Sequence, residues 1–544
     1  MYKVKKTNGI IKNAFRVGSI IVCIILISYN LPNSQKLVFA DNGDTKIDLN
    51  NDGKEEIVKF NGGELKIYNS DGKLIFQKDE DKSVYSNMSF IKDKKIDDTK
   101  VLIQNKTKDT SGTLSYYIYK MDDGEMVEVV HKENIYKGII TVKDNEEILE
   151  EIPIYVENDS NAVPSDTVKN YFTLEDNKLV LIKTEKLKYT PSKDASISEY
   201  YNNPSYAETE KMLESIANEK GIPTVIFKAI AYQESTWRQF KDGQPLIGSD
   251  HVGIGIMQVS DYGSTDTTYI NRLKYDIEFN IREGADILLK KWALQTYDGA
   301  TYKIPRVGNA SPNYLEHWYY AIWAYNGYSV RNNPRANTVD PKGYPNATYQ
   351  KLVIGHANNV FKNPMLDLYV YNPNLFPVVQ LPINLAVNLP RTDIAEISGK
   401  HAGNLKVKEK NYKYMTTTNL TIRDANMVAT SIYYIENDIV TIKGEPIIKD
   451  GYVNYYVEGS TKSGYVRGNW LKPVGDTNGD GQVDIYDFVK QSKNINGQGT
   501  VVNDTNRISI GNSDVNVDGI IDIKDIALTA LNYNFSLYRS DIKN

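Results

Sequence analysis

Cysteine and histidine, the side chains that build most zinc sites, are scarce in this chain. Only one of the 544 residues is cysteine, Cys23, which excludes an intrachain disulfide framework and a zinc site made of thiolates. The five histidines are scattered, with no pair at ligand spacing: His131, His251, His317, His356 and His401. A zinc hydrolase is therefore not expected.

An excess of positive charge is also lacking. The 64 Lys and Arg stand against 69 Asp and Glu, which gives a net charge of −5. A chain that binds nucleic acid over its whole length needs a strong basic excess, so we expect no nucleic-acid partner. The hydrophobic share of 41% and the charged share of 24% are those of globular proteins, not of disordered ones.

Long apolar runs are rare, and the clearest one lies near the N-terminus. Residues 17–29 form an apolar run that follows a basic stretch and is too short to span a bilayer comfortably. A small residue, Ala40, then precedes Asp41. This order is typical of a secretory signal, so we predict a signal peptide over residues 1–40, no transmembrane segment after its cleavage, and a secreted, extracellular or cell-wall-associated product. An uncleaved anchor is the alternative.

The pattern of the chain changes several times, which predicts a multidomain protein. Short apolar runs between Asn, Asp and Gly turns predict a β-rich N-terminal domain of unknown role over residues 41–195. Helical spacing predicts an α-helical domain over residues 200–365. Proline-punctuated residues 366–404 are expected to be a linker with little structure of its own. Short strands return over 405–474, and residues 475–544 are acidic and repetitive.

The helical domain carries an unusual carboxylate. Apolar spacing and capping residues predict helices over 207–220, 225–235, 278–294 and 311–327. Glu234 stands at the end of the second, largely apolar helix. Burial in such surroundings raises the pKa of a carboxyl, which can then stay protonated as a general acid. A surface glutamate that caps the helix is the alternative.

Four motifs follow one another in this domain: Glu234-Ser235, Gly253-Ile254-Gly255-Ile256-Met257-Gln258, Asn280-Ile281 with Gly284, and Ala324-Tyr325-Asn326-Gly327. In this order they resemble the soluble lytic transglycosylase family, glycoside hydrolase family 23. The resemblance implies a lysozyme-like fold similar to goose-type lysozyme. It also implies a peptidoglycan lyase that cuts the β-1,4 bond between N-acetylmuramic acid (MurNAc) and N-acetylglucosamine (GlcNAc).

The same resemblance implies a role for each matching residue. Glu234 would protonate the glycosidic oxygen and then, as a carboxylate, deprotonate the primary hydroxyl of the muramic acid, which attacks the anomeric carbon and leaves a 1,6-anhydro end. Met257 and Gln258 would line the sugar cleft. Tyr325 would hydrogen-bond or orient Glu234, and Asn326 would support the end of its helix. One acid that changes role suffices for this chemistry.

Two departures from the family pattern keep other functions open. Gly253 and Gly255 are only two residues apart, and an insertion over residues 241–251 adds Asp242 and Asp250. Either aspartate could activate water, as an inverting hydrolase requires, although Asp242 beside Gly243 is better explained by a turn. A hydrolytic glycosidase of lysozyme or chitinase type, and a catalytically dead protein that binds the wall, remain alternatives.

Two segments near the C-terminus have the spacing of EF-hand calcium loops. Oxygen ligands stand at the expected positions, with glycine at the sixth. The predicted ligands are Asp476, Asn478, Asp480, Gln482, Asp484 and Asp487 in the first loop, and Asp514, Asn516, Asp518, Ile520, Asp522 and Asp525 in the second. Each loop precedes a helical pattern. The pair resembles a type I dockerin, which implies two Ca²⁺ ions and a cohesin domain of a scaffold or another secreted protein as partner.

Two weaker resemblances complete the chain. Asn419-Leu420-Thr421-Ile422-Arg423-Asp424, Gly464-Tyr465-Val466 and Trp470-Leu471 resemble the bacterial SH3 family, which implies a small β-barrel; a spacer is the alternative. Near the N-terminus a third calcium ion could bind a loop that resembles those of integrin-like propeller repeats. Its candidate ligands are Asp48, Asn50, Asp52 and Glu56. About 150 residues cannot hold a whole propeller.

Overall fold

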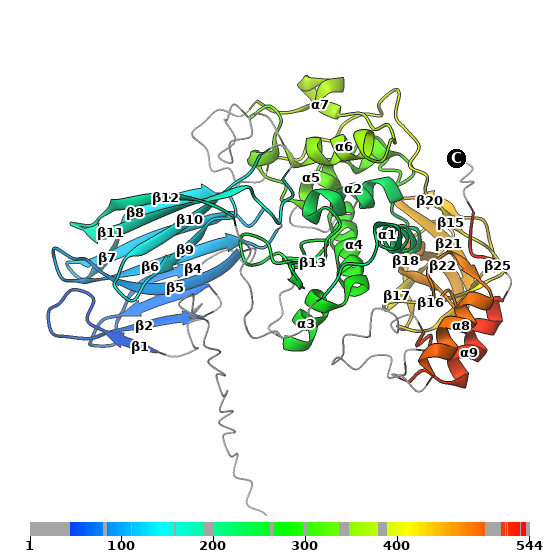
Figure 1. Cartoon of the computed structure of the whole chain (residues 1–544), viewed down its shortest axis with the longest axis horizontal. Helices are drawn as coiled ribbons and strands as arrows, with labels where there is room; N and C mark the ends of the chain where they lie inside the picture. Colours follow the sequence, from blue (N-terminus) through cyan, green and yellow to red (C-terminus); the bar gives the residue numbers. More distant parts are fainter. Residues whose placement is uncertain are drawn as a thin grey trace, which may run out of the picture.

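The computed structural model shows a strand-rich region, a helical region, a second strand-rich region and a short pair of helices, in that order along the chain (Figure 1). It describes residues 44–61, 63–79, 84–109, 111–156, 159–189, 201–261, 266–296, 303–336, 348–378, 389–495, 513–516, 518, 520–533 and 535–539. The coarse prediction of a multidomain chain with a β-rich N-terminal region and later helices is confirmed. The predicted signal peptide lies outside the described residues.

The N-terminal strand region consists of three four-stranded antiparallel sheets, and in each sheet strands that follow one another in sequence lie side by side. The first sheet contains β1 (Thr45–Ile47), β2 (Glu56–Asn61), β3 (Glu64–Tyr68) and β4 (Leu74–Asp79). The second contains β5 (Val84–Lys92), β6 (Thr99–Thr107), β7 (Leu114–Asp122) and β8 (Glu125–Ile135). The third contains β9 (Ile139–Val142), β10 (Ile148–Ile154), β11 (Asp166–Glu175) and β12 (Lys178–Lys188).

The middle sheet packs against the other two sheets, one on each face, and its strand β6 is buried continuously over Lys100–Ile103. In β6, Val101 and Ile103 point into a core shared with the first sheet, whereas Leu102 points into a core shared with the third. Successive side chains of a strand point to opposite faces, which explains this division. The strand region therefore has cores built from its own residues.

Capping residues mark both ends of α1 (Tyr206–Lys220), whereas the helix predicted over 311–327 is a 3₁₀ turn over Leu315–Trp318 followed by a helix over Tyr319–Tyr325. Ser205 and Glu208 form a capping box at the start of α1, and Gly221, with φ of 65°, ends it. The helices of this region are α1 (Tyr206–Lys220), α2 (Thr224–Ser235), α3 (Thr267–Tyr275), α4 (Ile277–Ala293), α5 (Tyr319–Tyr325), α6 (Tyr349–Asn359) and α7 (Leu368–Tyr371). Short 3₁₀ turns cover Leu315–Trp318, Val330–Asn332 and Pro373–Leu375, and a small hairpin pairs β13 (Phe240–Lys241) with β14 (Gln244–Pro245).

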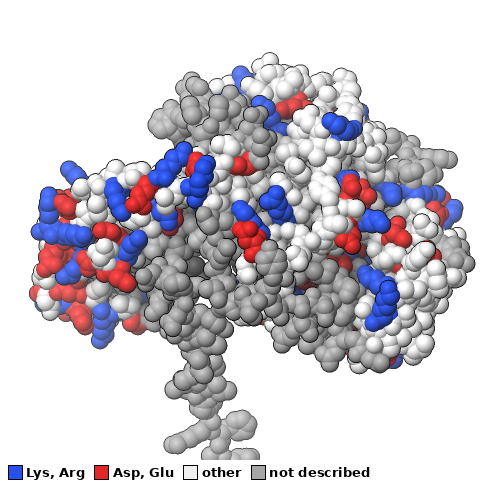
Figure 2. Space-filling view, in the orientation of Figure 1, with Lys and Arg blue, Asp and Glu red and all other residues white. Residues whose placement is uncertain are grey.

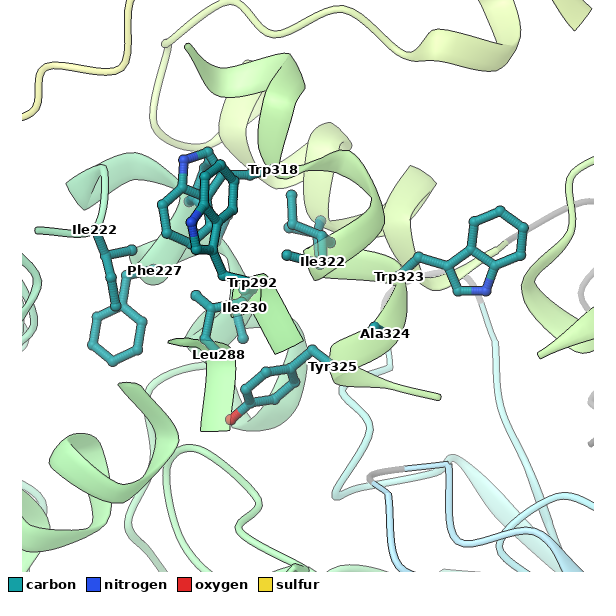
Figure 3. Packing of buried hydrophobic residues seen from close by; sticks show 14 of the residues in the cluster. Ile222, Phe227, Ile230, Leu288, Trp292, Trp318, Ile322, Trp323, Ala324 and Tyr325 are labelled. Atoms are coloured by element: carbon teal, nitrogen blue, oxygen red, sulfur yellow. The ribbon is translucent and has the colours of Figure 1, made fainter. Parts of the chain in front are cut away.

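Stacked tryptophans form the centre of the helical region (Figure 3). The rings of Trp292 and Trp318 lie 4.0 Å apart between centroids at 27°, and both are at most 1% exposed. Ile230 of α2 and Leu288 of α4 pack beside them. This arrangement places α2, α4 and α5 around one core, with the C-terminal end of α2 at its edge.

In the segment predicted to be a linker, residues 366–404, the described residues 366–378 and 389–404 instead contribute to the core of the helical region. The segment contains α7, and Leu368, Phe376 and Ile394 are buried in the helical core. The backbone of Gly308 bonds the carbonyl of Ile394 at 2.9 Å. Proline spacing suggested an extended chain, but apolar residues between the prolines give this segment a surface that the helices bury.

The C-terminal part combines a strand region with two helices that follow the acidic loops. Its eight-stranded sheet runs in the order β18-β17-β22-β21-β19-β16-β23, with β20 paired to β21. The strands are β16 (Lys413–Thr416), β17 (Leu420–Arg423), β18 (Ala429–Tyr434), β19 (Ile439–Ile442), β20 (Ile447–Lys449), β21 (Tyr452–Glu458), β22 (Ser463–Arg467) and β23 (Leu471–Pro473). A 3₁₀ turn, Gly468–Trp470, precedes β23; α8 (Ile485–Asn494), α9 (Ile523–Thr529) and the turn Ala530–Asn532 come later.

Short strands tie the chain end back to this part. The pairs are β15 (Val407–Lys408) with β26 (Tyr538–Arg539), and β24 (Gln482–Val483) with β25 (Phe535–Ser536). The indole of Trp292 also donates to the carbonyl of Gly451 at 2.8 Å, which joins the helical region to the second strand region. Within the described residues, the helices are all too short or too polar to cross a bilayer.

Replacing Trp318 by Ala should destabilise the helical region by about 3–5 kcal/mol, because it leaves a cavity beside Trp292. The measurement is the urea midpoint followed by tryptophan fluorescence, which the remaining indoles of this region still report. Val370→Ala is the matched control, since Val370 is 78% exposed and should leave the midpoint unchanged. Equal midpoints for W318A and the wild type would contradict the assignment of the stacked pair to the core.

Candidate active site

Glu234 is fully buried at the last turn of α2. The apolar residues of α2 fix this helix in the core, and Thr236 then takes a left-handed conformation with φ of 54°, which turns the chain away. The side chain of Glu234 therefore stays at the edge of the core. This position matches the predicted carboxylate at the end of an apolar helix and not a carboxylate in bulk water.

Two side chains that sequence reasoning missed contact the carboxyl of Glu234. The hydroxyl of Tyr349, at the start of α6, donates to Oε1 at 2.6 Å. The amide of Asn161, from the N-terminal strand region, donates to Oε2 at 3.1 Å. These residues stand 115 and 73 positions away from Glu234 in sequence. Neither lies in a recognisable motif, so no local signal could have found them.

Burial raises the pKa of Glu234 to about 7, and neighbouring groups oppose this rise. The positive charge of Lys137 and the hydrogen bonds from Tyr349 and Asn161 favour the charged form, whereas the negative charge of Asp250 disfavours it. A carboxyl with a pKa near neutrality can both give and take a proton at physiological pH. The electrostatics thus suit an acid that becomes a base within one reaction.

The segment that contains Met257 is fixed beside Glu234 by hydrogen bonds from several elements. The backbone N–H of Met257 donates to the amide oxygen of Asn280 at 3.0 Å, and the hydroxyl of Tyr325 donates to the carbonyl of Met257 at 3.0 Å. The hydroxyl of Ser235, next to Glu234, donates to the carbonyl of Ile256 at 2.7 Å. Residues from all four sequence motifs therefore meet here.

The close packing around Met257 and Gln258 explains why two neighbouring positions are glycine. A Cβ on Gly284 would lie 2.5 Å from Cγ of Met257. A Cβ on Gly253 would lie 2.7 Å from Oε1 of Gln258. Since real Cβ atoms do not approach so closely, larger side chains at either position would displace Met257 or Gln258.

Gln258 is buried and strained, with φ of 47°. Its amide nitrogen donates to the carbonyl of Gly255 at 2.8 Å. Its Oε1 has no hydrogen-bond partner among the described residues. A buried, unpaired acceptor held in a strained backbone is typical of a functional group that awaits a ligand.

Tyr325 differs in detail from its predicted role, whereas Asn326 lies at a helix end. The hydroxyl seen bonding Glu234 is that of Tyr349, whereas Tyr325 bonds the carbonyl of Met257. The charge of Glu234 adds to burial in raising the pKa of Tyr325, so the two groups are near each other. Asn326 caps the end of α5 and accepts a bond from Asn332 at 3.3 Å, as expected for a residue that supports a helix end.

The two inserted aspartates have different surroundings. Asp242 is exposed in the tight turn between β13 and β14, with φ of 52°. Asp250 is buried, and its Oδ2 lies 4.0 Å from Nζ of Lys137. Burial disfavours the charge of Asp250, but Lys137, Lys106 and backbone amides outweigh it, so its pKa lies below the ordinary value. Asp250 belongs to the site, and Asp242 is a turn residue.

Three tryptophans of the helical region whose indoles could in principle stack on a sugar are core residues. Trp318 and Trp323 are fully buried and Trp237 is 3% exposed. The ring of Trp237 stacks on Phe361 at 5.3 Å between centroids. None of these three indoles offers a face to a sugar in this structure.

The acidic loops near the C-terminus repeat one backbone pattern. In the first loop the amides of Gly479 and Gly481 donate to the carboxylate of Asp476, at 2.8 and 3.0 Å. The amide of Asp480 donates to Asn478 at 2.9 Å, and the corresponding bond in the second loop joins Asp518 to Asn516 at 2.8 Å. The turns thus have the shape that their spacing predicts.

The donor chemistry of these loops fits calcium. Among the described residues no group of three or more His, Cys, Asp or Glu side chains is gathered as a metal cluster. However, Asp476 is 9% exposed and Asp487 is fully buried. Burial and the charges of Asp487 and Asp480 raise the pKa of Asp476 to about 7. Carboxylate and amide oxygens of this kind are the ligands that Ca²⁺ takes in proteins.

The N-terminal candidate loop has the same turn as the C-terminal ones. The amide of Gly53 donates to Asp48 at 2.8 Å, and that of Asp52 donates to Asn50 at 3.2 Å. Glu56, at the start of β2, is 3% exposed and accepts a bond from the amide of Leu49 at 3.0 Å. Burial raises the pKa of Glu56. The residues present suit the same cation.

Comparison with known proteins yields no relative. No family model matches the chain, no curated protein matches it, and no solved structure matches its fold. The geometry of the site therefore carries the functional argument alone.

Replacing Glu234 by Gln should change stability in a pH-dependent way. The pKa of Glu234 is raised from 4.5 to about 7, so its contribution to folding is fully present below pH 4.5 and is lost as the pH rises through about 7. E234Q should equal the wild type near pH 4. Near pH 8 it should exceed the wild type by up to about 3 kcal/mol, the energy equivalent of that pKa difference.

The measurement is urea unfolding at both pH values, followed by tryptophan fluorescence. Glu436→Gln, at an exposed position, is the matched control and should show no such pH dependence. A stability difference for E234Q that is the same at pH 4 and pH 8 would contradict a raised pKa for Glu234.

Proposed function

We propose that this chain is a secreted glycosidase that cuts the MurNAc–GlcNAc β-1,4 bond of peptidoglycan, in the manner of a lytic transglycosylase. The observation that carries the proposal is the buried carboxyl of Glu234, held next to the segment containing Met257 and Gln258. Its pKa of about 7 suits proton donation followed by proton removal. The lysozyme-like assignment of the helical region is part of this proposal.

The surroundings of Asp250 favour 1,6-anhydro formation over hydrolysis. An inverting hydrolase needs a second carboxylate that takes a proton from water. Two amides, those of Val252 and Gly253, donate to Asp250 at 3.1 and 3.2 Å, and Lys137 lies beside it. Because these groups lower the pKa of Asp250, it is a weak base. The muramic acid's own hydroxyl, deprotonated by Glu234, is then the better nucleophile.

The other modules would attach the enzyme to its surroundings. The acidic loops and the helices α8 and α9 support a dockerin that binds two Ca²⁺ ions. Its candidate cohesin face includes Ile485, Tyr486 and Ile523, which are 56%, 67% and 72% exposed. The second strand region supports an SH3-like module, and its packing on the helical region also suits a spacer.

Digestion of purified peptidoglycan tests the catalytic proposal. Mass spectrometry of the products should show muropeptides that lack one water, the mark of anhydro ends. Glu234→Gln should slow cleavage by about 10²–10⁴-fold, the usual contribution of general acid–base catalysis, whereas Glu436→Gln should cleave normally. Reducing ends would support the hydrolase alternative. An intact wall with the wild-type chain would support a binding protein without activity.

Removal of calcium should destabilise the C-terminal helices. Asp476, Asp480 and Asp487 repel one another without a cation, so chelation should lower the thermal midpoint of α8 and α9, followed by circular dichroism. Free Ca²⁺ at about 100 times the Kd should restore about 2.7 kcal/mol per site. The double variant Asp476→Ala/Asp514→Ala should lose this response, and Asp424→Asn, outside the loops, should keep it. A midpoint independent of calcium in the wild type would exclude the calcium sites.

A further inference from the structure

The N-terminal strand region lies against the face of the helical region that carries Glu234. Figure 1 shows the two side by side, with one end of the strands turned toward the helices. Residues 159–163, between β10 and β11, contact the last turn of α2 and are here called the covering loop. Within it, Ser160 and Val163 form a bridge, and Ala162 is fully buried.

The covering loop bonds both the backbone and the side chain of Glu234. The amide of Asn161 donates to the carbonyl of Gln233 at 2.9 Å, and the amide of Ala162 donates to the carbonyl of Glu234 at 3.0 Å. The side chain of Asn161 donates to Oε2 of Glu234. These carbonyls belong to the last turn of α2, where no intrahelical donor is available.

Neighbouring side chains of the strand region hold the covering loop in place. The hydroxyl of Tyr155 donates to the carbonyl of Asn161 at 2.9 Å and lies 2.9 Å from the hydroxyl of Ser249 in the helical region. The ammonium of Lys106 donates to the carbonyl of Asp250 at 2.9 Å.

Two glycines show how closely the two regions fit. A Cβ on Gly112 of the strand region would lie 2.3 Å from Oδ2 of Asp250. A Cβ on Gly327 of the helical region would lie 2.4 Å from Oδ2 of Asp109. Side chains larger than glycine at these positions would push the two regions apart, so the contact is a fitted one.

This contact closes the site. Glu234, Met257, Gln258 and Tyr325 are all fully buried. A general acid must come within about 2.6–3.2 Å of the oxygen that it protonates, yet Asn161 already occupies such a position on Oε2 and Tyr349 on Oε1. With the covering loop in place, both carboxyl oxygens of Glu234 therefore already have donors, and a glycosidic oxygen cannot take the position of Asn161.

We propose that the N-terminal strand region is an inhibitor built into the chain, whose covering loop must leave Glu234 before a glycan strand can bind. That the covering loop regulates glycan cleavage rests on the proposed glycosidase function. That the loop covers Glu234 does not depend on it. A permanent wall at this place would leave Glu234 inaccessible in every state. The strand region has its own cores, so it can move as a body.

The outer surface of the strand region suits a part that separates into water. Figure 2 shows Lys, Arg, Asp and Glu densely interspersed over it. Because activity scales with the open fraction of the molecule, substitutions that open the cover should raise the rate of cleavage.

The test uses the full chain with Ala162→Trp. An indole cannot fit at a fully buried alanine beside Glu234, so the covering loop should be forced out. Leu181→Trp is the matched control, because Leu181 lies on β12 of the same region and is 53% exposed. Two readouts are compared with the wild type: coupling of the Glu234 carboxyl to an added amine by a water-soluble carbodiimide, measured by peptide mass spectrometry, and release of muropeptides from peptidoglycan.

A162W should label Glu234 and cleave peptidoglycan at least about tenfold faster than the wild type, and L181W should match the wild type. Equal labelling of A162W and the wild type would contradict the proposal that the covering loop blocks Glu234. Faster labelling with slower cleavage would contradict its role as an inhibitor, since the covering loop would then be part of the catalytic machinery. Faster labelling with no cleavage by any chain would support the cover and contradict the glycosidase function.

A second variant guards against misfolding caused by the indole. A protease site is inserted between Tyr189 and Tyr201, and the folded full chain is cut there. Dilution of the cut protein should increase labelling of Glu234, and adding the separated strand region back should reverse the increase. Labelling that does not change on dilution, with the two fragments shown to be separated, would overturn the cover.

Discussion

Burial of one carboxyl is the constraint on which the site depends. An apolar helix, α2, carries Glu234 to the edge of the core, where loss of water opposes its ionisation. Tyr349, Asn161 and Lys137 partly offset this cost. The result is a group that changes its charge near neutral pH without a second catalytic carboxylate, so one residue can serve as acid and base in turn.

The N-terminal strand region affects both the ionisation of Glu234 and the access of other molecules to it. It supplies Lys137, which is buried without a hydrogen-bond partner among the described residues and is placed next to Asp250. It also supplies the amide of Asn161. If the whole strand region moves away, Glu234 loses Asn161 and Lys137 but regains water, and Tyr349 becomes its remaining fixed donor. In the closed state Glu234 is thus buried and hydrogen-bonded, and only in the open state can it protonate a substrate.

Sequence signals within single segments predicted helix limits in this chain, but not the contacts between distant segments. Ser205, Gly221 and the apolar spacing of α2 and α4 are contained within single segments, so the helix limits and the position of Glu234 were predictable. Tyr349 and Asn161 reach Glu234 only through tertiary packing of distant segments. The start of α6 has no side-chain cap, whereas Asp266 caps α3 and was a local signal for that helix. The segment over 366–404 was misread because its prolines are visible in sequence and the surface that buries it is not.

The helical region contacts the second strand region at the end of α1 and the N-terminal strand region at the end of α2. The groups at these two helix ends show why the first contact can be permanent and the second can open. The last carbonyls of α1, those of Glu219 and Lys220, accept bonds from Lys408 and from Asn469, which are themselves buried side chains of the second strand region. Removing them would leave buried polar groups unpaired on both sides. The last carbonyls of α2 accept bonds from backbone amides of the covering loop. Because water can satisfy the end of a helix once it is exposed, these two carbonyls of α2 do not prevent the second contact from opening.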